Sequence, residues 1–152
     1  DAVVYGTGIG NIALGSGSES GKLGENASYT TALGTYAKAT NTYSTAVGNY
    51  AQATSTYATA IGNNSRASAS YAIALGSGAK AYSSHSSAIG GGARVFGSNS
   101  VALGVDASVG TGTYNDGNNT YTVTADTRNS VALGSYSVAT SPSSICQFFI
   151  YE

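Results

Sequence analysis

The sequence of 152 residues has few of the residue types that build an ordinary globular core or an active site. It contains one Cys, one Pro, one His, no Met and no Trp. A single Cys excludes an intramolecular disulfide framework and a Cys-based metal cluster. No apolar run approaches the ~18 residues of a membrane span. Only 9% of the residues are charged and the net charge is −1, so bulk charge does not indicate a nucleic-acid-binding protein.

What the sequence does contain is a repeat. An Ala–aliphatic–Gly tripeptide recurs at a constant interval of fourteen positions, from Ala32-Leu33-Gly34 to Ala102-Leu103-Gly104. An earlier copy, Ala13-Leu14-Gly15, stands nineteen positions before the first of these, which predicts a five-residue insertion around residues 21–25. A last copy, Ala132-Leu133-Gly134, follows after a gap of more than two intervals. We interpret that gap as one repeat plus an insertion, in preference to two repeats and two further residues.

The period predicts the fold. Each repeat holds two short runs of alternating residues separated by Gly, which is typical of two strands and two tight turns. Fourteen residues leave no room for a helix of the kind found in helical repeat arrays. We therefore predict an all-β protein, a parallel β-solenoid in which each fourteen-residue coil hydrogen-bonds to the next. Adjacent strands of such a stack lie ~4.8 Å apart.

The alternation also assigns the faces of a coil. With the central Ala of each tripeptide as position zero, positions zero, +5 and +7 are small and are predicted to point inward. The aliphatic residue at +1 has the opposite parity and is predicted to point outward, where self-association would cover it. The alternative is that these residues fill a wider coil interior. The column consists of Leu14, Leu33, Val47, Ile61, Leu75, Ile89, Leu103 and Leu133.

Two stretches carry a resemblance to a known family. Asn99-Ser100-Val101-Ala102-Leu103-Gly104 and the run from Asn129 to Gly134, each followed by small residues at +5 and +7, resemble the head repeat of trimeric autotransporter adhesins, the YadA-like head of Gram-negative bacteria. The resemblance covers residues 9–141. It implies a left-handed parallel β-roll, three chains packed side by side as a homotrimer, and an outer-membrane anchor outside this fragment. It also implies cell-surface adhesion to host matrix proteins, glycans or other cells.

These observations divide the chain into a head and a tail. We assign residues 1–141 to the head, with a hairpin insertion at about 110–127. Residues 142–152 lack the repeat and are interpreted as a cap or a neck fragment.

The sequence gives little support to catalysis or metal binding. His85 occupies the position that Tyr holds in the preceding repeats, and Cys146 lies in the tail with no His or Asn nearby. Asp106, Asp116 and Asp126 are ten residues apart and lack the dense carboxylate spacing of a calcium loop. We therefore expect a protein that is not an enzyme and has no cofactor and no metal site.

A column of basic residues is the main candidate for binding. Position +6 has the parity of an outward residue and is basic in four of five consecutive repeats, while no acidic residue occurs between residues 26 and 105. Such a column suits polyanions such as sulfated glycans or acidic matrix proteins. It also suits solubility and protection against sheet aggregation, and this alternative stays open. The residues at this position are Lys38, Gln52, Arg66, Lys80 and Arg94.

Aromatic residues accompany this column. Positions +4 and +8 share its parity and supply Tyr36, Tyr50, Tyr82 and Phe96. Exposed aromatic rings beside cations suit sugar rings or protein hot spots. Stacking between successive coils explains them equally well.

The predicted hairpin is a second candidate binding loop, because we expect it to protrude from the coils and it carries Tyr114 and Tyr121. An adhesin head is the leading functional hypothesis, and a structural spacer of the adhesin fibre is the main alternative. An ice-binding solenoid is a weaker alternative, because the Thr-x-Thr pattern of Thr40-Asn41-Thr42 and Thr54-Ser55-Thr56 stops after two repeats.

Overall fold

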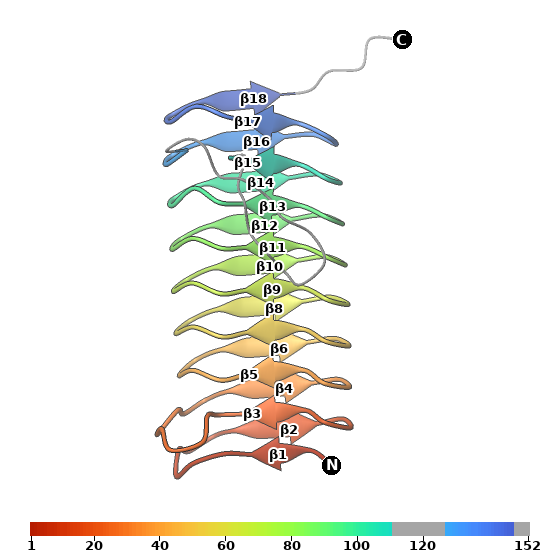
Figure 1. Cartoon of the computed structure of the whole chain (residues 1–152), viewed down its shortest axis with the longest axis vertical. Helices are drawn as coiled ribbons and strands as arrows, with labels where there is room; N and C mark the ends of the chain where they lie inside the picture. Colours follow the sequence, from red (N-terminus) through yellow and green to blue (C-terminus); the bar gives the residue numbers. More distant parts are fainter. Residues whose placement is uncertain (111–126, 148–152) are drawn as a thin grey trace.

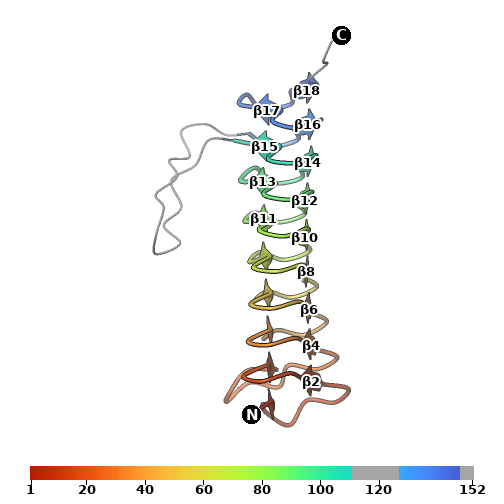
Figure 2. The ribbon, with the colours of Figure 1, turned by 90° about the vertical axis from the view of Figure 1, so that its right-hand side faces the viewer.

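The computed structural model describes residues 1–110 and 127–147, so the predicted hairpin with Tyr114 and Tyr121 lies outside the described residues. The chain winds into a straight stack of coils, with its N-terminus at one end and β18 at the other (Figure 1). Two parallel sheets of nine strands each run along the stack and face each other across each coil (Figure 2). In the described part of the chain, no helix is long and apolar enough to cross a membrane.

The two sheets contain alternate strands of the chain. Sheet A consists of β1 (Val3–Val4), β3 (Glu19–Ser20), β5 (Lys38–Ala39), β7 (Gln52–Ala53), β9 (Arg66–Ala67), β11 (Lys80–Ala81), β13 (Arg94–Val95), β15 (Ser108–Val109) and β17 (Val138–Ala139). Sheet B consists of β2 (Ile12–Leu14), β4 (Thr31–Leu33), β6 (Thr45–Val47), β8 (Thr59–Ile61), β10 (Ile73–Leu75), β12 (Ser87–Ile89), β14 (Val101–Leu103), β16 (Val131–Leu133) and β18 (Ile145–Gln147). Ala46 pairs with Ala60, the same position of the next repeat, so the predicted parallel solenoid is confirmed.

The strand register also shows where the repeat is interrupted. Ala13 pairs directly with Ala32, which confirms the five-residue insertion between the first two copies. Ala102 pairs directly with Ala132, and β15 pairs with β17. No further coil therefore lies between these neighbours, and the interpretation of the long gap as a single insertion is confirmed.

The stack of coils continues past residue 141, where the sequence pattern ends. β18 continues sheet B, with Cys146 opposite Ala132 at the usual spacing. Cys146 packs against the alanine core and takes the inward position that Ala holds elsewhere. The sequence pattern missed this strand because Ile145-Cys146-Gln147 lacks the Ala–aliphatic–Gly tripeptide, whereas a small apolar thiol fits the same space.

The core is made almost entirely of alanine and serine. Residues at positions zero, +5 and +7 are buried along the solenoid, as predicted, except for the half-buried Ala13 in the first copy, and the largest of them are Val95 and Val109. Position −2 also points inward, with Ser44 and Ala58 as examples, which the sequence analysis did not foresee. None of the eight aliphatic residues at +1 is buried, so the alternative of a wider aliphatic interior is wrong.

Each coil closes with two tight turns. The Ser44 amide donates to the Asn41 carbonyl at 3.0 Å, and Tyr43, the third residue of this turn, has φ +59°. On the opposite side the Ala51 amide donates to the Gly48 carbonyl at 3.3 Å, and Tyr50 has φ +55°. The turns therefore place left-handed residues at both edges of the stack, where side-chain alternation no longer applies.

The glycine of the tripeptide is required at its position. Gly62 has φ +130°, and a Cβ there would lie 2.5 Å from the carbonyl oxygen of Gly76 in the next coil. Only a residue without a side chain permits this backbone conformation and this approach of successive coils. Inward serines complete the turns, since the Ser65 hydroxyl donates to the Gly62 carbonyl at 3.0 Å.

Candidate functional site: two unlike faces and two aromatic edges

The outward face of sheet B is uncharged in every strand that the structure describes. Its residues form two columns, one at position −1 and the aliphatic column at +1, and parallel pairing keeps both in register. The aliphatic residues are half-buried or exposed, with Leu14 at 67%, Ile61 at 41% and Leu103 at 45% relative exposure. Position −1 adds Thr31, Thr45, Thr59, Ile73 and Val101 among others. This face is therefore a long, flat strip of Thr and aliphatic side chains.

The outward face of sheet A carries the predicted basic column. Lys38 pairs with Gln52, Gln52 with Arg66, Arg66 with Lys80, and Lys80 with Arg94, each through direct parallel register. The four cations are half-buried, which leaves each side chain partly accessible. Strands in a sheet lie ~4.8 Å apart, so the column presents one polar side chain at each such step.

The basic column has an acidic neighbour that the sequence analysis missed. Glu19 lies opposite Lys38 in the sheet, and its Oε1 lies 2.9 Å from the lysine Nζ. The lysine side chain is 39% exposed and the glutamate side chain 31%. The five-residue insertion offsets Glu19 from the regular period, which hid the relation from a search at that period. The column is therefore neutralised at its N-terminal end.

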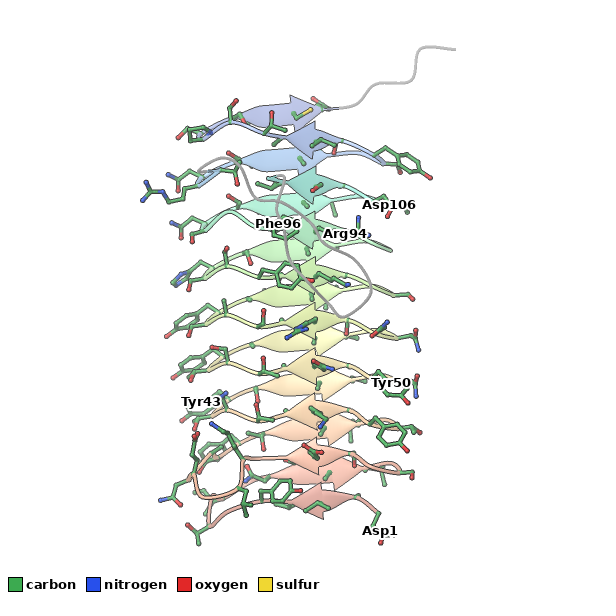
Figure 3. All side chains as sticks on the ribbon, in the orientation of Figure 1. Asp1, Tyr43, Tyr50, Arg94, Phe96 and Asp106 are labelled. Atoms are coloured by element: carbon green, nitrogen blue, oxygen red, sulfur yellow. The ribbon has the colours of Figure 1, made fainter. Side chains whose placement is uncertain are left out.

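The aromatic residues near the column fall into two separate pairs. Tyr82 and Phe96 follow β11 and β13 directly, and their ring centroids are 5.1 Å apart. Tyr36 and Tyr50 stack at 5.0 Å, but both have positive φ and stand in turns. Figure 3 shows Tyr50 at the edge of the stack and Arg94 and Phe96 over its broad face. The expectation that all four share the outward direction of the column is wrong for Tyr36 and Tyr50, because alternation fails in a turn.

The opposite edge carries a continuous aromatic ladder, with Tyr43 marking its position in Figure 3. Successive ring centroids are 5.2, 4.8, 4.7 and 4.8 Å apart, with interplanar angles of 4–10°. We call this feature the tyrosine ladder; it consists of Tyr29, Tyr43, Tyr57, Tyr71 and His85. His85 thus continues a stack of rings, as expected from its place in the repeat.

The side chains that could take part in catalysis or bind a metal are dispersed in the described part of the chain. His85 stands at an edge, and Cys146 lies in the last coil against the core. Among residues 1–110 and 127–147, no three His, Cys, Asp or Glu side chains lie together as a set of metal ligands. The candidate sites among the described residues are therefore the extended outer faces of the two sheets and the aromatic edges.

The comparison with curated proteins gives no significant match. The family model of the YadA head domain repeat, which contains two copies of the repeat, matches residues 24–51, 53–79, 81–107 and 124–145. Three of these segments span about two coils each, and the last includes Val131 and its partner in the next coil, Ile145 at the start of β18. The matches cover more than half of the chain. The protein therefore belongs to the YadA head family, the surface-exposed adhesin heads of trimeric autotransporters.

Proposed function

We propose that this chain is a non-catalytic adhesin head that forms a homotrimer through the outward face of sheet B and attaches to anionic partners through sheet A. The partners would be sulfated or carboxylated glycans or acidic matrix proteins of a host or another cell. The trimer would be displayed at the bacterial surface by an outer-membrane anchor outside this sequence. The observation that carries the proposal is the contrast between the uncharged face of sheet B and the basic column on sheet A.

Assembly is supported by the exposure of the aliphatic column. In a single chain this column runs in register along sheet B, with several side chains about half exposed. Apolar surface in water costs about 25 cal/mol per Å2, so a strip of this length favours association. Three chains whose solenoid axes run parallel cover every coil of the strip at once, because the column is straight. Closed three-fold symmetry then leaves sheet A facing outward.

Anion binding is supported by the stacking of like charges. Lys80 stands directly between Arg66 and Arg94 in adjacent strands. Like charges opposite each other in a sheet destabilise it, so local stability does not account for the arrangement. A linear polyanion along the column would neutralise several cations together, and three copies in a trimer would add avidity.

The test is to neutralise the column and leave sheet B unchanged. The variant combines Lys38→Gln, Arg66→Gln, Lys80→Gln and Arg94→Gln. We expect it to lose most of its salt-sensitive binding to an immobilised sulfated glycan and to remain a trimer in sedimentation. A matched gain-of-function variant, Gln52→Lys, fills the gap in the column and should bind more tightly. Equal binding of all three proteins across a salt titration would refute the role of the column.

A deletion separates an adhesin from a spacer. Removing residues 39–66 takes out two whole coils and joins Lys38 to Ala67, which is equivalent to Ala39, so the solenoid register is preserved. If the chain were only a spacer, the adhesin fibre would attach to its target as well as before, and only the reach of the fibre would shorten. An adhesin of the proposed kind would bind the sulfated glycan less tightly, because the contact shortens and one cation is lost.

A further inference from the structure

The tyrosine ladder exposes the outer parts of its rings. Stacking covers the ring faces, yet Tyr29, Tyr43, Tyr57 and Tyr71 remain 43–49% exposed. The accessible parts are therefore ring edges and phenol ends. Each interior tyrosine has one aromatic ring on each side, at about one strand spacing. The hydrogen bonds between coils hold these rings in place. The Tyr57 amide donates to the Thr42 carbonyl and the Tyr71 amide donates to the Thr56 carbonyl, both at 3.1 Å.

Tyrosine is an unusual residue for this position. All four tyrosines have φ between +56° and +59°, a left-handed conformation that suits Gly and Asn and is uncommon for a bulky side chain. Later coils of the same chain use Asn99 and Asn129 there, with φ +54° and +57°. The turn therefore does not need tyrosine. A run of four strained tyrosines is an observation that favours a function for the rings themselves.

We propose that the tyrosine ladder is a site of oxidative coupling, in which neighbouring tyrosines form dityrosine and join adjacent coils covalently. The oxidant would be hydrogen peroxide acting through a haem peroxidase. Each phenol loses one electron and one proton, and the two hydrogen atoms reduce one peroxide to two waters. The two tyrosyl radicals form a C–C bond between the ring carbons ortho to oxygen. The hydrogens on those carbons then move to the oxygens and both rings regain aromaticity.

Proximity gives the ladder an advantage over tyrosines that have no stacked neighbour. Tyr57 and Tyr71 have the shortest ring separation in the ladder, 4.7 Å, and their backbones lie in adjacent coils. Tyr136 is more exposed, at 67%, but it has no stacked ring among the described residues. If exposure alone controlled oxidation, Tyr136 would dominate. If held proximity controls coupling, the ladder dominates, because neighbouring groups have a high effective concentration.

The experiment uses the whole chain, a haem peroxidase and a limiting amount of hydrogen peroxide, followed by trypsin and mass spectrometry. Tyr71 is the only tyrosine in the tryptic peptide 67–80, while peptide 39–66 contains Tyr43, Tyr50 and Tyr57. We expect these two peptides to become joined with loss of two hydrogen atoms. Peptide 129–152 contains both Tyr136 and Tyr151, so fragmentation assigns its linked residue. The product from peptides 39–66 and 67–80 should exceed any product linked through Tyr136 by at least about tenfold.

Two matched variants identify the reacting ring. Tyr57→Phe keeps an aromatic ring in the ladder but removes the phenol, and should abolish the link between peptides 39–66 and 67–80. Tyr50→Phe changes the same peptide at the opposite edge and should leave the link unchanged. Persistence of the link in Tyr57→Phe, or its loss in Tyr50→Phe, would overturn the proposal.

A mixture of isotope-labelled and unlabelled chains, refolded together, tests whether the link forms within one chain. Links that contain one labelled and one unlabelled peptide in the proportion expected for random pairing between chains would contradict coupling along the ladder. Dominance of Tyr136 products would contradict it as well. The expected result is a pair of peptides that carry the same label, in a link that is lost when the reaction is run in denaturant.

Discussion

The glycine column offers a direct test of how successive coils approach each other. Gly76 and Gly78 belong to the same turn and both have positive φ, at +128° and +70°. A Cβ on Gly76 would lie 2.5 Å from the carbonyl oxygen of Gly90, whereas the nearest atom to a Cβ on Gly78 is 3.9 Å away. Replacing each by alanine therefore separates the cost of φ from the cost of crowding.

The magnitudes follow from these two geometries. At Gly78 alanine faces only the left-handed conformation, which costs about 1–2 kcal/mol for a residue with a Cβ. At Gly76 the backbone lies in a region essentially restricted to glycine, which costs up to about 3 kcal/mol. The new methyl group must also push the next coil away. That movement breaks the hydrogen bond from the Gly90 amide to the Leu75 carbonyl, which is 2.8 Å long. Losing that bond adds about 1 kcal/mol.

We therefore expect Gly76→Ala to lower the free energy of unfolding by about 4 kcal/mol and Gly78→Ala by about 1–2 kcal/mol. Gly78→Asn should cost less than either, because Asn64 and Asp106 adopt φ of +57° and +52° at the same position of other coils. Urea unfolding followed by circular dichroism, at one fixed protein concentration, measures the three values. Equal destabilisation by the two alanine variants would show that close approach of the glycine backbones does not limit the fold.

Two further predictions concern the faces. Glu19→Gln removes the ion pair with Lys38, and should lower the free energy of unfolding by less than about 1 kcal/mol because both side chains are partly solvated. The difference from the parent chain should disappear in concentrated salt, and a loss that persists there would contradict an electrostatic origin. Ile61→Asn with Leu103→Asn should convert the proposed trimer to single chains in sedimentation while the β signal in circular dichroism is retained, since neither side chain is part of the core. Unchanged sedimentation would contradict assembly through sheet B.

Much of the fold could be predicted because the same spacing and the same alternation of residues recur in every regular repeat. The spacing of Ala46 and Ala60 gives the coil length, and alternation within a strand gives the direction of Lys80 and Leu75. These inferences are local, since a residue in an extended strand must alternate between two faces. They held wherever the backbone is extended and the period is regular.

The same reasoning failed where either condition is absent. Tyr36 and Tyr50 stand in turns with positive φ, so parity gave the wrong direction. Cys146 replaces the Ala of the repeat, and only its pairing with Ala132 shows that the coil continues. Glu19 is offset by an insertion, so its position beside Lys38 depends on the register of β3 against β5.

The sequence by itself determined the period, the parallel stacking, the small interior and the outward aliphatic column, because each is set by the alternation of a short strand and the length of a coil. The tertiary structure decided which residues meet across coils: the Glu19–Lys38 ion pair, the stacked rings at both edges and the pairing of β18. Those contacts depend on the strand register and on the turn residues with positive φ. Both are fixed only when successive coils pair with each other.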